Sequence, residues 1–263
     1  MDVRALILTG FGINCDAETE SAFNCAGAVA QRVHLNDIIE RPAILDEFHA
    51  LAIPGGFSFG DDVASGKILA NRLRYKLGAP IKKFIADGKL VIGICNGFQV
   101  MVKMGILPLF DSEFVQEVTL TNNDSGRFEN RWVTLKTAPD TQCVWLKGIG
   151  QMELPIRHGE GKFIPKDEAV LRRLIANGQV ALRYCAPDGS PANGKFPLNP
   201  NAAVDDIAGI CDPTGRIFGL MPHPEAHVDR TNHPRWTRED RPEEGIGLRV
   251  FRNAVEYVQT AFA

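Results

Sequence analysis

The first hundred residues alternate short apolar runs with longer segments of mixed polarity. Apolar runs at residues 3–8, 28–34, 50–53 and 89–94 predict buried strands of the parallel type. Helical patterns separate them: one ends at Gly27, a weak one follows Pro42, one carries Ile68, Leu69 and Leu73, and one is expected to begin at Pro80. This β-α-β-α-β order specifies a parallel sheet with helices on both faces.

The pattern changes near residue 114. Segments 115–120, 131–136, 153–157 and 179–184 alternate polar and apolar positions, as antiparallel strands do. We expect them to form a smaller antiparallel sheet laid on the main one. Residues 207–211 and 216–221, joined by a turn at 212–215, predict a hairpin. The predicted fold class is therefore α/β, with a mostly parallel central sheet flanked by helices and a smaller antiparallel sheet.

The end of the chain contains a charged segment and a helix. Residues 229–245 are rich in proline and arginine and have no periodicity, which predicts a solvated loop. From Gly245 a final helix places its apolar residues on one face, at Leu248, Phe251, Val255 and Val258. That face is expected to pack against the sheet.

Composition narrows the class of protein. A chain of 263 residues with 44% hydrophobic residues can bury a large core, and we expect one domain spanning 1–263. A net charge of -3 argues against general binding to nucleic acid or anionic membranes. Six cysteines without C-x-x-C spacing predict reduced thiols and a cytoplasmic location. No apolar run approaches the roughly 20 residues that a membrane span requires.

Cys95 is the first candidate for chemistry. It lies where the run 89–94 turns into a helix, with Gly93 and Gly97 two residues to either side. A tight strand-to-helix turn strains the corner residue, exposes its side chain and requires small neighbours. A helix N-terminus also favours the thiolate and lowers a pKa that is about 8.5 in free cysteine. The alternative is a buried cysteine acting as a small hydrophobic residue.

The loop after the run 50–53 is a candidate oxyanion site. Gly55 and Gly56 follow the carboxyl end of a predicted parallel strand, where consecutive N–H groups can form an anion-binding concavity. A phosphate loop is excluded because Gly66-Lys67 is followed by Ile68 and not by Ser or Thr. We expect the backbone of Gly56 and Phe57, with the N–H of Asn96, to bind an oxyanion.

A second chemical segment is Met221-Pro-His223-Pro-Glu225. Residues two apart in extended chain point to the same side, so Glu225 can hold the imidazole of His223 in one tautomer. One alternative is a zinc site that adds His227 and His233. Another is a histidine in a surface loop.

Together, Gly93-Ile-Cys95-Asn-Gly-Phe-Gln99 and His223-Pro-Glu225 resemble the class I glutamine amidotransferases. Further stretches resemble the glutaminase subunits of phosphoribosylformylglycinamidine synthases: 54–61, 122–128, 155–161 and 207–210. The resemblance implies a flavodoxin-like fold and hydrolysis of glutamine by Cys95, His223 and Glu225. It also implies that Gln99, Ser125, Phe128 and His158 lie near the substrate, and that Glu160 lies near the glutamine or the ammonia exit.

The resemblance further implies partners. The chain has no phosphate loop and no magnesium-binding carboxylate cluster in its sequence, so we expect no cofactor or metal here. ATP and magnesium would act in a large synthetase subunit, often joined by a small bridging subunit. One departure is residues 199–203, Asn-Pro-Asn-Ala-Ala, where the family usually has Asn-Pro-Asn-Gly-Ser. The segment 229–245 is another, since it lengthens the chain.

Two rival functions remain from the sequence. A cysteine peptidase or chaperone of the related flavodoxin-like superfamily would cleave peptides and ignore free glutamine. A silent regulatory subunit would bind glutamine without turnover, although all three triad positions are filled.

Overall fold

The computed structural model describes residues 1–111 and 113–263. Its main feature is a nine-stranded sheet within those residues. The strands run across the sheet in the order β2 (Val29–His34), β1 (Arg4–Thr9), β3 (Ala50–Ile53), β4 (Leu90–Ile94), β11 (Ile217–Leu220), β10 (Ile207–Cys211), β9 (Val180–Cys185), β6 (Glu129–Thr137) and β7 (Gln151–His158). The shorter strands β5 (Val118–Thr121) and β8 (Lys162–Pro165) pair with each other.

Strand direction divides the main sheet into two halves. β2, β1, β3 and β4 are parallel to their neighbours. β11 is parallel to β4 but antiparallel to β10, and β9, β6 and β7 continue the sheet with antiparallel pairing. The α/β class, the parallel half and the hairpin β10–β11 are thus confirmed. The sequence was wrong about which strands form the smaller sheet, because only β5 and β8 do so among the described residues. Alternating polarity indicates a half-exposed strand but does not identify its neighbours.

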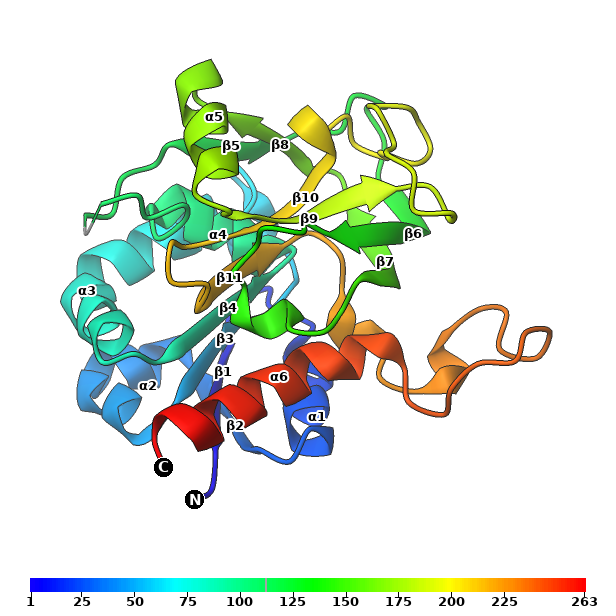
Figure 1. Cartoon of the computed structure of the whole chain (residues 1–263). Coiled ribbons are helices and arrows are strands. Elements are labelled where there is room, and N and C mark those ends of the chain that lie inside the picture. Colours follow the sequence, from blue (N-terminus) through cyan, green and yellow to red (C-terminus); the bar gives the residue numbers. More distant parts are fainter. Residues whose placement is uncertain (112) are drawn as a thin grey trace.

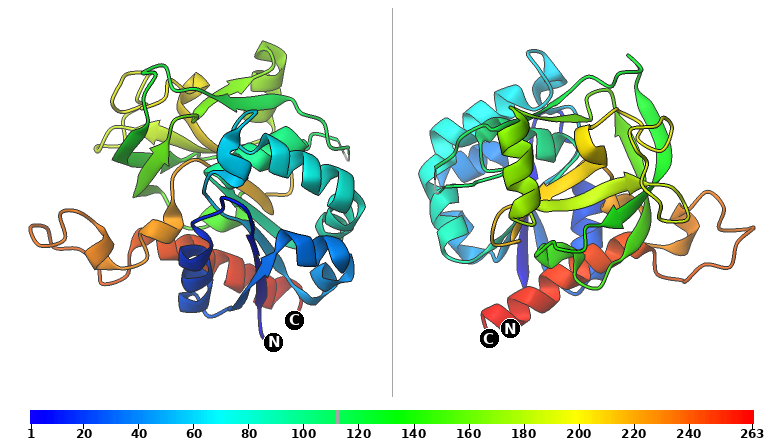
Figure 2. Two further views of the ribbon diagram at one scale, coloured as in Figure 1. Left: turned by 180° about the vertical axis from the view of Figure 1, so that it is seen from behind. Right: turned by 45° about the horizontal axis from the view of Figure 1, so that its top comes forward.

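Helices cover both faces of the parallel half (Figures 1 and 2). On one side α1 packs against α6, and on the other α3 packs against α4. The helices are α1 (Asp16–Cys25), α2 (Leu35–Glu40), α3 (Lys67–Ala86), α4 (Asn96–Met104), α5 (Glu168–Ala176) and α6 (Ile246–Ala261). α6 buries Leu248, Phe251, Val255 and Val258, as its apolar face predicts. No helix in the described part of the chain is long and apolar enough to cross a bilayer.

Two helix predictions were wrong. α3 continues through Pro80, where the sequence predicted a new helix. Proline within a helix costs about 3 kcal/mol, but Leu77, Ile81 and Phe84 extend the buried face across it and offset that loss. The short helix α2 was missed, and the segment after Pro42 forms only a 3₁₀ turn, η1 (Pro42–Glu47).

The turn between β4 and α4 depends on its two glycines. A methyl group added at Gly93 would lie 2.2 Å from the sulfur of Met101, and one added at Gly97 would lie 1.8 Å from the carbonyl oxygen of Ile53. The second clash involves the backbone of β3, which cannot move away without disturbing the sheet. Gly97 therefore allows α4 to begin directly against β3.

We expect Gly97→Ala to lower the free energy of unfolding by at least about 3 kcal/mol, since the added carbon would overlap backbone atoms. Gly78→Ala is the matched control. Gly78 lies inside α3 with no atom within 4 Å of an added methyl group, so this change should stabilise the protein by about 0.5–1 kcal/mol. Urea denaturation measures both, and equal midpoints for the two variants would refute the packing argument.

Candidate active site

Cys95 lies at the turn that the sequence predicts. It is the residue before α4 and has φ 51° and ψ -106°, a strained conformation for a residue with a side chain. Cys95 is 5% exposed, and its thiol donates to the carbonyl oxygen of Arg157 at 3.6 Å. Strain of this kind persists where the surrounding structure imposes it, here the pairing of β4 between β3 and β11.

His223 reaches Cys95 because their strands are neighbours. β11 runs parallel to β4, with Leu220 opposite Ile94, so the residues after both strands emerge at the same edge. The N–H of Cys95 donates to the carbonyl oxygen of Leu220 at 2.8 Å. From the far end of the sheet, the carbonyl oxygen of Pro155 accepts the N–H of His223 at 2.9 Å. The antiparallel half thus curls back onto the site.

Glu225 orients the imidazole. Nδ1–H of His223 donates to Oε1 of Glu225 at 2.6 Å, and the two side chains are 2% and 1% exposed. The contact forms across a single 3₁₀ turn, η5 (Pro224–Ala226), so the predicted contact exists but its predicted extended backbone was wrong. Because this bond holds the proton on Nδ1, the lone pair of Nε2 is left to accept a proton.

The electrostatics favour a charged imidazole. Burial opposes the charged ring, but the carboxylate of Glu225 and the sulfur of Cys95, with the thiol of Cys15 nearby, outweigh it. The pKa of His223 is therefore raised well above its ordinary value. A ring that gains a proton easily is suited to accept the proton of a nucleophilic thiol.

The glycine loop after β3 lies against the triad. A methyl group at Gly55 would lie 2.9 Å from Cε1 of His223, and one at Gly56, where φ is 149°, would lie 2.4 Å from the carbonyl oxygen of Gly12. The same oxygen accepts the N–H of Phe57 at 2.7 Å. In this conformation the N–H of Phe57 is therefore engaged, and it would have to leave Gly12 to bind an oxyanion.

Asn96 and Gln99 belong to one hydrogen-bond network beside Cys95. Nδ2 of Asn96 donates to Oε1 of Gln99 at 2.9 Å, while Oδ1 of Asn96 accepts the N–H of Ser58 at 3.1 Å. Nε2 of Gln99 donates to the carbonyl oxygen of Glu160. The network connects α4 to the glycine loop and to the segment that follows β7, so it fixes the walls around the thiol.

The remaining predicted substrate residues lie at different depths. Phe128 is 53% exposed and its ring lies 6.3 Å from that of Phe57, so the two mark the outer surface of the site. Ser125 is exposed and donates to Glu129 at 2.8 Å. His158 is buried, and burial together with the nearby charge of His223 lowers its pKa to about 3. His158 is therefore neutral at physiological pH.

The alternative zinc site of the sequence does not form. Nδ1–H of His227 donates to the carbonyl oxygen of Glu153 at 2.8 Å, and the rings of His227 and His233 pack against Trp132. In the described residues, the group of potential ligands around His223 includes Glu225 and Cys15 but not these two histidines.

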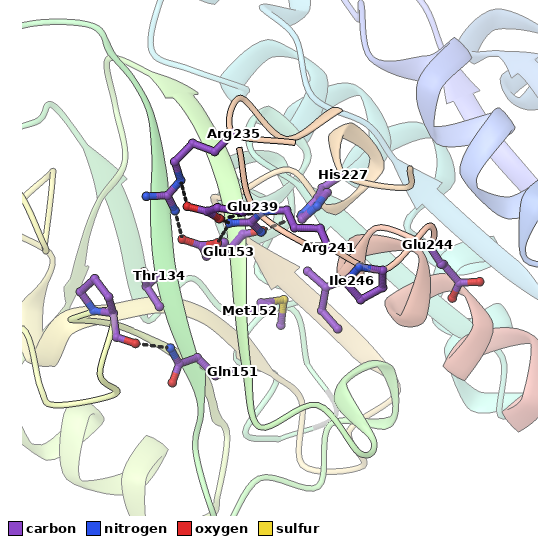
Figure 3. A pocket seen from close by; sticks show the side chains of 12 residues that line it. Thr134, Gln151, Met152, Glu153, His227, Arg235, Glu239, Arg241, Glu244 and Ile246 are labelled. Atoms are coloured by element: carbon purple, nitrogen blue, oxygen red, sulfur yellow. Dashed lines mark hydrogen bonds and ion pairs between the residues drawn. The ribbon is translucent and has the colours of Figure 1, made fainter. Parts of the chain in front are cut away.

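Residues 229–245 form a loop that extends from the molecule (Figure 1), but it is tied to β6 where His233 packs against Trp132 and to β7 through Glu153. Arg235 and Arg241 both bind the carboxylate of Glu153, at 3.0 and 2.8 Å. Burial would raise the pKa of Glu153, but Arg241 and its neighbours hold it below the ordinary value. Beside this cluster lies a cavity of about 510 Å³, lined also by Met152 and Ile246 (Figure 3). The triad does not line this cavity.

Cys15 is the residue near the triad that sequence reasoning missed. It is 9% exposed, precedes α1, and its N–H donates to the carbonyl oxygen of Gly55 at 3.2 Å. Its sulfur lies within 4.8 Å of ligand atoms of His223 and Glu225. A signal was available, because Cys15 follows the glycine turn after β1, and the carboxyl ends of parallel strands converge at one edge.

Comparison with known proteins agrees with this geometry. Residues 2–258 match the CobB/CobQ-like glutamine amidotransferase domain. Phosphoribosylformylglycinamidine synthase subunit PurQ of Dehalococcoides mccartyi is 47% identical over 259 residues, covering 98% of each chain. The subunit of the same name from Methanococcus maripaludis is 43% identical over 265 residues, covering 97% of each.

A solved structure extends the comparison. A chain in the structure of PurLQS from Thermotoga maritima superposes with a TM-score of 0.72 at 29% identity, covering 98% of this chain and 100% of that one. At this coverage the similarity spans both halves of the sheet. This chain therefore belongs to the glutamine amidotransferase family, among the relatives of the PurQ subunits of phosphoribosylformylglycinamidine synthase.

Proposed function

We propose that this chain hydrolyses glutamine to glutamate and ammonia and passes the ammonia to a synthetase subunit. The observation that carries the proposal is the buried assembly of Cys95 at a strained turn, His223 beside it and Glu225 bonded to His223. Thiol, base and orienting carboxylate are the components of nucleophilic acyl transfer. The family relationship identifies the acyl donor as the side-chain amide of glutamine.

The first half of the proposed reaction forms a thioester. His223 takes the proton of the Cys95 thiol as the sulfur attacks the amide carbon, and then gives a proton to the departing nitrogen, which leaves as ammonia. Glu225 stabilises the charged imidazole between these transfers. In the second half, a water molecule activated by His223 attacks the thioester and releases glutamate.

Backbone groups and nearby side chains complete the proposed site. The N–H of Asn96 and the Gly56–Phe57 loop bind the tetrahedral oxyanion, each such donor being worth about 3–4 kcal/mol of barrier. Gln99, Ser125, Phe128 and His158 contact the substrate, with Gln99 and His158 buried and Ser125 and Phe128 exposed. No metal or cofactor takes part in these steps.

The acceptor reaction belongs to a partner. The chain similar to this one comes from a structure of PurLQS from Thermotoga maritima. We infer a PurL-type synthetase subunit and a PurS-type bridging subunit for this chain too. The synthetase would use ATP and magnesium with the released ammonia to convert formylglycinamide ribonucleotide to its amidine in purine synthesis.

Affinity labelling with a diazoketone analogue of glutamine tests the proposal. We expect the analogue to modify Cys95 alone, as peptide mass spectrometry would show, and to abolish glutamate release measured with the synthetase and its nucleotide present. Cys25, which is exposed, is the internal control for non-specific alkylation. Modification of another cysteine with Cys95 intact would contradict the assignment.

The same assay separates the rival functions. A peptidase would cleave peptides and leave glutamine intact, whereas a regulatory subunit would bind glutamine and release no glutamate with the synthetase present. Either result would refute the proposed function.

A further inference from the structure

Cys15 has no role in the proposed hydrolysis, yet its thiol lies inside the site. A methyl group added at Gly55 would lie 3.3 Å from Sγ of Cys15 and 2.9 Å from Cε1 of His223. The thiol and the ring therefore border the same small space, which a side chain at residue 55 would fill. The thiol itself donates to Oδ1 of Asn14 at 3.3 Å. The sulfur lone pairs therefore remain available to a further ligand.

The neighbours of Cys15 offer two more donor atoms. Sγ of Cys15, one ring nitrogen of His223 and one carboxylate oxygen of Glu225 all lie within 4.8 Å of one another. Oε2 of Glu225 has no hydrogen-bond partner among the described residues, although that side chain is only 1% exposed. Unpaired buried polar atoms are costly, and a bound ligand would remove that cost.

This donor set selects a class of ligand. Thiolate, imidazole and carboxylate are the ligands that Zn²⁺ takes in proteins, at about 2.0–2.3 Å. Mg²⁺ and Ca²⁺ prefer oxygen ligands, so a sulfur and a nitrogen among three donors disfavour them. The cation would replace the proton that Nδ1 of His223 shares with Oε1 of Glu225, and small side-chain rotations would widen their 2.6 Å separation to the spacing of a tetrahedral site. A fourth position remains for water.

We propose that Cys15, His223 and Glu225 form an inhibitory site for a thiophilic divalent cation, with Zn²⁺ as the best fit. Binding rests on these three side chains alone, and its consequence rests on the proposed function. A ring coordinated through Nδ1 carries its proton on Nε2, so His223 can no longer take the proton of the Cys95 thiol. Glutamine hydrolysis would then stop reversibly while the fold and Cys95 stay intact.

Zinc binding is tested without activity, using Cys95→Ala in the full chain to remove the other nearby thiol. Competition with a colorimetric zinc chelator should show one Zn²⁺ bound per chain. Adding Cys15→Ser should weaken binding at least tenfold, whereas adding Cys25→Ser, at an exposed cysteine, should not. His223→Gln is a second ligand variant in case residue 15 does not tolerate replacement. No binding to Cys95→Ala, or equal binding after both ligand changes, would overturn the site.

Inhibition is tested with the synthetase present. The Zn²⁺ concentration that halves each protein's own rate of glutamate release should rise at least tenfold in Cys15→Ser, and chelator should restore the wild-type rate. Equal inhibition of both active proteins would overturn the proposal. A chain that binds Zn²⁺ through Cys15 but never releases glutamate would refute the proposed function and leave the zinc site supported.

Discussion

Cys95→Ala is expected to lower glutamine-dependent amidation by at least about 10⁴-fold, because no other thiol can form the thioester at that position. Activity with ammonium salt as the nitrogen source should stay near the wild-type value, since the synthetase supplies that chemistry. The measurement is formation of the amidine product from each nitrogen source with the partner subunits present. Loss of both activities would show instead that the substitution disrupts the complex.

Cys185→Ala is the matched control. Cys185 is also buried, but it lies at the end of β9 and outside the triad. We expect this variant to keep both activities, because it removes a sulfur of the same size from the same domain. A similar loss in the two variants would contradict a special role for Cys95.

Glu225→Gln is expected to reduce the rate of glutamate release by roughly 10³-fold. Glutamine has nearly the same shape, but its amide cannot stabilise the charged imidazole. The carboxylate raises the pKa of His223, so its removal should lower that pKa. The measurements are the turnover rate and the titration of the His223 ring by NMR.

The direction in which the His223 titration moves follows from the sign of its pKa shift. A lower pKa means that the protonated form of His223 is lost at a lower pH in the variant than in the wild type. Glu256→Gln, on the exposed side of α6, is the control and should change neither quantity. An unchanged His223 titration in Glu225→Gln would contradict the claim that the carboxylate raises the pKa of His223.

The parts of the fold that depend on local pattern were predictable. The alternation of apolar runs and helical segments predicted the parallel strands β1 to β4, and the spacing of Gly93 and Gly97 around Cys95 predicted the turn. His223 and Glu225 were paired by spacing alone, and they do make a hydrogen bond. These features were predictable because each depends on residues that are close together in the sequence.

The parts that depend on distant contacts were not predictable. The sequence could not show that β6 and β9 join the main sheet, because a strand's pattern reports burial and not its neighbour. Helix α3 runs through Pro80 because its packing outweighs a local rule. Cys15 was missed because its position near His223 depends on backbone hydrogen bonds between the loop after β1 and the loop after β3.

The pairing of β4 with β11 has a consequence for how this enzyme can vary. Nucleophile and base are far apart in sequence, but their separation is set by one hydrogen-bonded strand pair, Ile94 opposite Leu220. Within the intervening chain, β7 contacts both the base and the nucleophile, through the carbonyl oxygens of Pro155 and Arg157. Insertions, deletions and drift should therefore accumulate in the loops of residues 106–206 that lie outside 122–128 and 155–161, without altering the reactive geometry, and grafting of foreign loops should be best tolerated there.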